Sequence, residues 1–261
     1  MATEIHPSAI VAKNAEIGQD VIVGPFAIVE EDTRIGDRSV IEASAHIKKL
    51  TTLGEDCQIH SFASIGGPPQ DLKYQGERTV LEMGDRITVR EFVTINRGTS
   101  GGGGATRVGS DCFVMAYCHI AHDCQLEDHV IMSNGATLAG HVEVAAHAII
   151  GGLSAVHQFV RIGTHAFIGG KTGVAQDIPP YMMAVGDRAR LRGPNLIGLK
   201  RAGFTAEELK AIKQAYKRIW RTKGNLKGAC KDVLTEFGDL ERIQHLIEFV
   251  KNSQRGVTSA A

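Results

Sequence analysis

Aliphatic residues recur at every sixth position through the first two thirds of this chain. Each of these residues opens a unit of six residues, and we call them unit openers. They cover three stretches, 5–65, 83–95 and 108–174, and the spacing of six is unbroken within each stretch. The second position of a unit is often Gly or Ala, and the fifth is small. Neither the helix period of about 3.6 nor the strand period of 2 produces this pattern. A hexapeptide repeat is instead typical of a parallel β-helix.

Three hexads complete one triangular coil of 18 residues, in which each hexad forms a short flat strand. We expect the aliphatic openers to point inward and stack between coils, with the small fifth residue inside near a corner. Gly, Asn and Asp tolerate the unusual backbone angles that such corners need. The repeat therefore predicts an all-β parallel β-helix, or hexapeptide solenoid, over residues 1–186.

Two insertions interrupt the repeat and predict loops at 66–82 and 99–107. The second contains four consecutive glycines at 101–104, and no Lys-Ser/Thr follows them. We interpret this run as a flexible loop, because a phosphate-binding loop needs that continuation. A packed solenoid has no structural need for polar insertions, and inserted loops on one face often form the binding face.

The apolar spacing becomes helical from Thr205 onward. Thr205 and Glu208 have the spacing of a capping box, and Gly224 is placed to end the helix that follows. Two further helices are predicted at about 226–237 and 240–251. Residues 187–261 should therefore form a small α-helical C-terminal domain. We expect it to cover the last coil, whose strand edges would otherwise be exposed.

The predicted solenoid and the predicted helical domain differ in net charge, although the whole chain has a formal net charge of zero. Residues 1–186 carry 13 Lys+Arg against 21 Asp+Glu, a net of −8, and residues 187–261 carry 16 against 8, a net of +8. The zero total argues against general nucleic-acid binding. The basic C-terminal part indicates an acidic partner or an anionic ligand, or else simply a solvated helical surface.

Four of the five cysteines occupy the small fifth position of a hexad: Cys57, Cys112, Cys118 and Cys124. They are expected to be small core residues rather than metal ligands, because successive ones face different sides of a coil. An odd cysteine count and the lack of a secretory signal favour a reducing compartment. No apolar run approaches the roughly 18 residues of a membrane span. We therefore expect a cytoplasmic protein without membrane insertion.

Four of the eleven histidines converge when the chain is wound with the 18-residue period. His119, His122, His141 and His157 fall within a window of five positions on consecutive coils, which lie about 4.8 Å apart. Gly140 should stack directly over His122. Three interpretations compete: histidines on an exposed edge, a metal site of three histidines between subunits, and a general base with substrate-binding neighbours. Asp123 could orient the His122 ring, or it could be only a corner residue.

Short motifs are distributed along the chain, at 62–66, 70–74, 94–99, 119–124, 138–141, 150–152, 155–159, 173–181 and 198–201. These motifs resemble those of the UDP-N-acetylglucosamine 3-O-acyltransferases, the hexapeptide-repeat family that catalyses the first step of lipid A synthesis. The resemblance covers nearly the whole chain, including the helical tail.

The resemblance implies a homotrimer of left-handed β-helices with active sites between neighbouring subunits. His122 would remove the proton from the glucosamine 3-hydroxyl, which then attacks the thioester of a 3-hydroxyacyl chain on acyl carrier protein. Asp123 would orient His122, and the Gly140 N–H would stabilise the oxyanion. No metal or other cofactor is implied.

The resemblance also implies a binding set. The sugar and phosphates would be held by Asp71, Lys73, His119, His141 and Gln158, with Gln70 and His157 lining the same cleft. Asn195 and Arg201 would hold the nucleotide end, and Gly170 would leave a deep groove for a long acyl chain. The basic tail would bind acyl carrier protein, which is acidic.

Departures from the family pattern leave the acceptor open between a 3-hydroxyl and a 3-amino sugar. They are Asn96, Arg188, Ile197 and Ala202, where other members have His, His, Glu and Arg. Among rival enzymes, the N-acyltransferase of the same pathway has an extra N-terminal uridine-binding domain, for which a repeat that starts at residue 5 leaves no room. A metal-dependent hydratase would need a bound ion, and an ice-binding solenoid would need a flat array of Thr that the sequence lacks.

Overall fold

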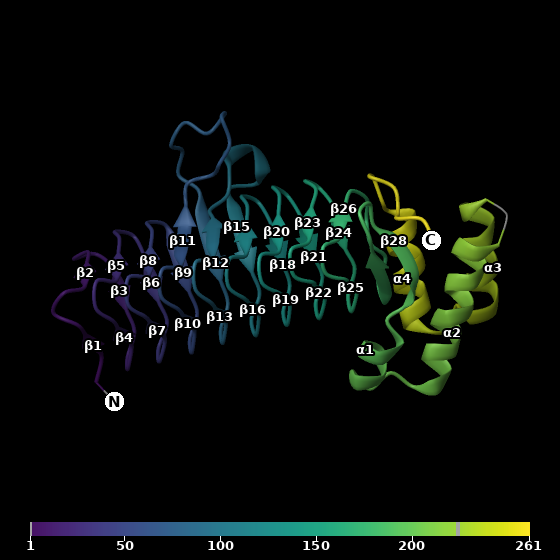
Figure 1. Ribbon diagram of the computed structural model, residues 1–261, viewed down its shortest axis with the longest axis horizontal. Coiled ribbons are helices and arrows are strands. Elements are labelled where there is room, and N and C mark those ends of the chain that lie inside the picture. Colours follow the sequence, from purple (N-terminus) through teal and green to yellow (C-terminus); the bar gives the residue numbers. More distant parts are fainter. Residues whose placement is uncertain (1, 223–224) are drawn as a thin grey trace.

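The chain forms a long three-sided prism of short strands with helices gathered at one end (Figure 1). The computed structural model describes residues 2–222 and 225–261. Each side of the prism is one sheet, and from β1 to β26 every third strand in sequence belongs to the same sheet. This arrangement confirms the parallel β-helix that the hexads predict.

The first sheet has 11 strands: β1 (Glu4–Ile5), β4 (Ile22–Val23), β7 (Val40–Ile41), β10 (Gln58–Ile59), β13 (Thr88–Val89), β16 (Phe113–Val114), β19 (Ile131–Met132), β22 (Ile149–Ile150), β25 (Phe167–Ile168), β27 (Met182–Val185) and β28 (Arg190–Pro194). The second has nine: β2 (Ile10–Val11), β5 (Ile28–Val29), β8 (His46–Ile47), β11 (Ser64–Gly67), β14 (Thr94–Asn96), β17 (His119–Ile120), β20 (Thr137–Leu138), β23 (Ala155–Val156) and β26 (Gly173–Val174). The third has eight: β3 (Glu16–Ile17), β6 (Arg34–Ile35), β9 (Thr51–Leu53), β12 (Val80–Met83), β15 (Ala105–Val108), β18 (Gln125–Leu126), β21 (Glu143–Val144) and β24 (Arg161–Ile162).

From Val23 onward the unit openers are buried and form the core, as predicted. Ile120 pairs with Leu138 and Leu138 pairs with Val156 in parallel register. These three side chains are 0%, 0% and 3% exposed. Burying each one stabilises the coil by about 1.5–3 kcal/mol relative to an exposed position, so the repeat itself fixes the register.

Both insertions leave the prism continuous. Ile65 pairs with Ile95 across the first, and Met83 pairs with Val108 across the second. The first insertion, between β11 and β12, projects far beyond the prism (Figure 1). The second contains a single turn of 3-10 helix, η1 (Ser100–Gly102). Next to the first insertion, β11 continues to Gly67 and β12 begins at Val80. After the second insertion, β15 begins at Ala105.

Some corners hold Asp with a positive φ, as expected, for example Asp56 and Asp111, whereas others hold larger residues. Phe62, Phe92 and Tyr117 have positive φ values and stack face to face, with ring centroids 5.2 and 5.0 Å apart. A second corner carries the stacked rings of His129, His147 and His165. Contact between equivalent rings on successive coils offsets part of the cost of a left-handed backbone conformation in a bulky residue.

The C-terminal part contains α1 (Leu196–Arg201), α2 (Ala206–Tyr216), the π-helical turn η2 (Lys217–Arg221), α3 (Leu226–Phe237) and α4 (Glu241–Lys251). The capping box is present: Glu208 N–H donates to Thr205 Oγ1 at 3.1 Å, and Thr205 N–H donates to Glu208 Oε2 at 2.8 Å. Gly224 lies outside the described residues. No helix among those described is long and apolar enough to cross a membrane.

The helices pack on the last coils of the prism. Tyr181 Oη lies 3.1 Å from His245 Nδ1, and the Arg161 guanidinium lies 4.6 Å from the centre of the Phe249 ring. Strand β28 lies beyond residue 186 and pairs antiparallel with β27. One strand of the first sheet therefore falls within the region expected to be helical, because the chain turns back once along the sheet before α1 begins.

Candidate active site

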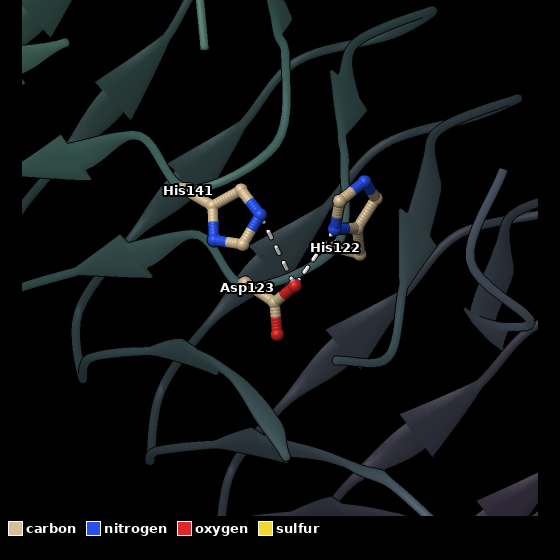
Figure 2. Close-up of side chains that lie close together, drawn as sticks. All are labelled: His122, Asp123 and His141. Carbon is tan, nitrogen blue, oxygen red and sulfur yellow. Dashed lines mark hydrogen bonds and ion pairs between the residues drawn. The ribbon is translucent and has the colours of Figure 1, made fainter. Parts of the chain in front are cut away.

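His122 and Asp123 form a hydrogen-bonded pair at a corner of the prism (Figure 2). His122 Nδ1 lies 2.7 Å from Asp123 Oδ2. A carboxylate can only accept, so Nδ1 carries the proton and Nε2 is left with a free lone pair. Figure 2 shows Nε2 on the side of the ring away from Asp123. A neutral imidazole in this tautomer is equipped to take a proton from a substrate.

The Asp123 carboxylate is fully buried, with a side-chain exposure of 0%. Thr99 supplies two donors to it: its backbone N–H lies 2.8 Å from Oδ1, and its hydroxyl lies 2.7 Å from Oδ2. The Asp123 N–H in turn donates to Thr106 Oγ1 at 2.8 Å. Asp123 has a φ of 61° and is thus a corner residue as well as the partner of His122. Asp123 is therefore not only a corner residue, because its carboxylate also hydrogen-bonds to the His122 ring.

His141 is the third side chain of this cluster. Its Nε2 lies 3.7 Å from Asp123 Oδ2, and its ring is perpendicular to that of His122 with centroids 5.2 Å apart. The other face of His141 stacks on Phe159 at 4.4 Å. Burial lowers the pKa of His141, and the charge of His122 lowers it further. The carboxylates of Asp123 and Asp71 raise the pKa and offset part of this shift. A His141 kept neutral is suited to hydrogen bonding with a substrate.

The other two predicted histidines lie near this cluster but make separate contacts. His119 Nδ1 lies 2.7 Å from Thr94 Oγ1, and burial lowers the pKa of His119, with the charge of His122 adding to the effect. His157 is exposed, and its Nδ1 lies 3.1 Å from the backbone carbonyl of Gln158, which is also exposed. Of the four predicted histidines, His122 and His141 are thus the two that lie against Asp123.

Gly140 stacks over His122 as the repeat predicts. A Cβ atom at Gly140 would lie 2.6 Å from His122 Cε1 and 2.8 Å from Nε2. Its N–H donates to no acceptor among the described residues. Gly170 lies on another corner, where a Cβ atom would meet only the backbone of Gly152, at 3.3 Å.

The remaining predicted residues lie on two separate segments. Gln70, Asp71 and Lys73 belong to the projecting loop between β11 and β12, where Lys73 N–H donates to Asp71 Oδ1 at 2.9 Å. Asn195 caps α1, and its amide donates to the His165 carbonyl at 3.1 Å, while Arg201 is the last residue of α1. In Figure 1 the projecting loop and α1 lie on opposite sides of the prism. One chain alone does not gather the set.

The projecting loop is anchored by Arg97, which the sequence analysis did not single out. This buried guanidinium donates to the Gly66 carbonyl at 2.9 Å and to Tyr74 Oη at 3.3 Å, with its cation 5.9 Å from the Tyr74 ring centre. Asn96 donates to the Pro68 carbonyl at 3.0 Å. Both residues belong to a motif of the predicted family, but nothing in the sequence shows which loop they hold.

The cysteines are core residues, as predicted. All five are buried and free of disulfides. Burial raises the pKa of Cys118 to about 11 and that of Cys124 to about 12. Neither thiol can act as a nucleophile near neutral pH, since the thiolate is the reactive form.

His122, Asp123 and His141 offer three ligand atoms within 4.8 Å of one another, which is close enough to bind a metal ion. The hydrogen bonds of the cluster favour another use. Asp123 Oδ2 already accepts from the Thr99 hydroxyl and from His122 Nδ1. A metal ligated by these three atoms would have to displace both donors. The arrangement is therefore better suited to orienting a base than to holding a cation.

A groove of about 710 Å³ runs beside Asp123 and His141. Its walls include Glu143 and Arg161 of the third sheet and the C-terminal segment near Arg255. Glu143 and Arg161 form an ion pair at 3.1 Å. A polar ligand could therefore lie next to the His122–Asp123 pair.

Comparison with known proteins identifies the family. A family model described as "Udp N-acetylglucosamine O-acyltransferase; Domain 2" matches residues 177–258, and one described as "Bacterial transferase hexapeptide (six repeats)" matches 14–49 and 105–140. An acyl-[acyl-carrier-protein]–UDP-N-acetylglucosamine O-acyltransferase from Thermodesulfovibrio yellowstonii is 47% identical over 97% of this chain and 98% of its own. A relative of the same name from a Janthinobacterium species is 49% identical over 97% and 98%. The chain belongs to this family of O-acyltransferases.

Solved structures agree with this assignment. The UDP-N-acetylglucosamine acyltransferase from Campylobacter jejuni superimposes on this O-acyltransferase with a TM-score of 0.94 at 40% identity, over 99% of this chain and all of that one. The enzyme from Francisella novicida gives a TM-score of 0.93 at 35% identity, over 98% of this chain and 94% of that one. The solenoid and the helical tail are therefore both features of the family.

Proposed function

We propose that this O-acyltransferase transfers a 3-hydroxyacyl chain from acyl carrier protein to the 3-hydroxyl of the glucosamine in UDP-N-acetylglucosamine, in lipid A biosynthesis. The names of its relatives support the two substrates. The proposal includes left-handed winding of the β-helix and assembly into a homotrimer in the cytoplasm. The observation that carries the chemistry is the hydrogen bond from His122 Nδ1 to the buried Asp123 carboxylate.

His122 is the general base in this mechanism. Its Nε2 takes the proton of the sugar hydroxyl as that oxygen attacks the thioester carbonyl. The Asp123 carboxylate holds the ring in the required tautomer and stabilises the imidazolium that forms. Gly140 lies next to the His122 ring, and its backbone N–H donates to the developing oxyanion. When the tetrahedral intermediate collapses, the ester C–O bond is complete, the C–S bond breaks, and His122 returns the proton to the leaving thiolate. No covalent enzyme intermediate is needed.

The binding roles follow the family motifs. Asp71, Lys73, His119, His141 and Gln158 hold the sugar and phosphates, and Gln70 and His157 line the same cleft. His141 supports this role, because it is kept neutral and lies in contact with the His122–Asp123 pair.

A neighbouring subunit would complete the site. Asn195 and Arg201, which are proposed to hold the nucleotide, lie on α1, across the prism from the loop that carries Asp71 and Lys73. Both segments can contact one substrate only if they come from different copies of the chain. A homotrimer with sites between subunits meets that requirement.

The basic C-terminal part is the proposed docking surface for acyl carrier protein. Lys213, Lys217 and Arg221 are exposed and, with Arg192, line a concavity of about 810 Å³ between β28 and the α2–η2 segment. An acidic carrier protein is attracted to such a surface, with an on-rate that falls as salt increases. The full set of basic residues proposed to contact it is Lys200, Arg201, Lys210, Lys213, Lys217, Arg218 and Arg221. Of these, Arg218 is already paired with Glu236.

The test is mass spectrometry of the products formed from UDP-N-acetylglucosamine and a mixed pool of 3-hydroxyacyl carrier-protein thioesters. The proposal predicts one O-acylated sugar nucleotide, labile to mild base, with a long chain. A parallel reaction with the 3-amino analogue of the sugar distinguishes the two acceptors, since an amide survives the base. Full activity after exhaustive chelation is also expected. Loss of activity on chelation, with recovery on adding zinc, would instead assign the His122–Asp123–His141 cluster to a metal.

A further inference from the structure

The glycine-rich insertion packs against the most buried charged group of the site. Asp123 has a side-chain exposure of 0%, and both of its oxygens receive donors from Thr99. Thr99 is itself 7% exposed and caps the 3-10 turn η1 by accepting from Gly102 N–H at 3.1 Å. A buried carboxylate is stable only when such donors replace the water it has lost.

The glycines of this insertion have different structural requirements. A Cβ atom on Gly102 would lie 2.0 Å from Asp123 Cγ, so only glycine fits there. A Cβ atom on Gly101 would meet nothing within 4 Å. Gly103 and Gly104 have φ values of 93° and 82°, which L side chains rarely adopt. The segment is therefore shaped around the Asp123 carboxylate, and the flexible loop expected from sequence is a fitted cover.

We propose that Thr99 and Gly102 are positioning residues for catalysis, which hold Asp123 so that it can orient and tune His122. This inference rests on the proposed acyl transfer. The Thr99 hydroxyl and the His122 N–H share one oxygen, Oδ2. Removing the hydroxyl leaves more of the negative charge of that oxygen to stabilise the His122 imidazolium. The base then stays protonated to a higher pH.

The first test compares Thr99→Val, which keeps the shape but removes the hydroxyl, with Thr99→Ser, which restores it. Thr99→Val should lower kcat by about 10- to 100-fold, a usual effect of removing an outer partner of a reacting group, and should move the acidic limb of the kcat/KM profile to higher pH. KM for the sugar nucleotide should change little, whereas the melting temperature should fall by a few degrees, because the buried Asp123 carboxylate loses one of its donors. Thr99→Ser should recover both the rate and the pH profile.

Either of two results would overturn this role for Thr99. One is a Thr99→Val enzyme with wild-type kcat and an unmoved acidic limb. The other is a loss of rate with an unmoved limb that Thr99→Ser does not rescue, which would show a merely structural contribution to the loop.

The second test is a matched glycine pair. Gly102→Ala should displace the carboxylate and lower kcat about 100-fold, since a misplacement of about 1 Å has that effect. Gly101→Ala, one residue away, should behave as wild type. Equal rates for the two variants would contradict the claim that the loop is packed closely around the Asp123 carboxylate.

Crystal structures of these variants provide a readout that does not depend on the reaction. The distance between His122 Nδ1 and Asp123 Oδ2, which is 2.7 Å here, should lengthen in Gly102→Ala and stay unchanged in Gly101→Ala. An unaltered distance in Gly102→Ala would contradict the inference even if the wild-type enzyme used other substrates. Absence of acyl transfer by the wild type would instead reject the proposed function and leave this geometric test in force.

Discussion

Substituting Gly140 by alanine tests whether the base must occupy its observed position. The new Cβ atom would lie 2.6 Å from His122 Cε1, whereas carbon atoms in contact are about 3.5–4.0 Å apart. The His122 ring must therefore move by about 1 Å. A displacement of this size costs about 100-fold in rate, which corresponds to about 2.7 kcal/mol in the activation barrier. The backbone N–H of residue 140 remains, so the loss would report on the base rather than on a missing oxyanion donor.

The assay is steady-state transfer from a 3-hydroxyacyl carrier-protein thioester, with kcat and KM measured separately and a melting curve for each variant. Gly140→Ala should lose kcat while the melting temperature stays within a few degrees of wild type, because the ring has room to move outward from a corner. Gly101→Ala serves as the control for the same substitution at an uncrowded position. A Gly140→Ala enzyme with wild-type kcat would refute the reasoning.

Three further predictions concern other parts of the molecule. Gly170→Met should shift the product toward shorter acyl chains in mass spectra, since a Cβ atom there meets only the Gly152 backbone and the longer side chain is expected to shorten the proposed groove; an unchanged chain profile would reject that groove. Lys217→Glu should raise KM for the carrier-protein thioester but not for a small pantetheine thioester, and equal effects on both donors would argue against docking there. Burial, with the charges of His147 and Arg242, lowers the pKa of His165 to about 4. The unfolded chain therefore binds the extra proton as the pH falls from about 6.5 to 4, and stability declines by about 1–3 kcal/mol. In His165→Phe, the free energy of unfolding, measured by urea titration, should fall less steeply as the pH is lowered. An unchanged pH dependence would mean that other groups cause the decline.

The solenoid could be predicted from sequence because the period of the openers is set by packing alone. Ile120 and Leu138 must stack at the 18-residue spacing, and the register follows. The same periodicity placed Gly140 over His122 and put His141 in the same window of the coil as His122. The capping box at Thr205 was equally readable, since it depends on local spacing.

Contacts made across the insertions could not be read in this way. Thr99 reaches Asp123 from 24 residues away, through a loop that breaks the 18-residue period. Arg97 reaches Tyr74 for the same reason. The 18-residue period predicts which residues are neighbours within the regular coils. It does not predict the contacts of an inserted loop that folds back onto them.

A corner of stacked histidines was missed for a different reason. His129, His147 and His165 lie 4.6 Å apart in succession with nearly parallel rings. They are spaced 18 residues apart in the sequence, so the repeat does place them together. Corner positions were expected to hold Gly, Asn or Asp, so a stack of aromatic rings at a corner was not predicted.

The most direct test of the central claim is single-turnover acyl transfer by His122→Ala beside the wild type, at several pH values. If His122 is the base, the variant should fold normally and lose about 10²–10⁴-fold in rate, and the pH dependence on the acidic side should disappear. A His122→Ala enzyme that transfers the chain at close to the wild-type rate would contradict the account.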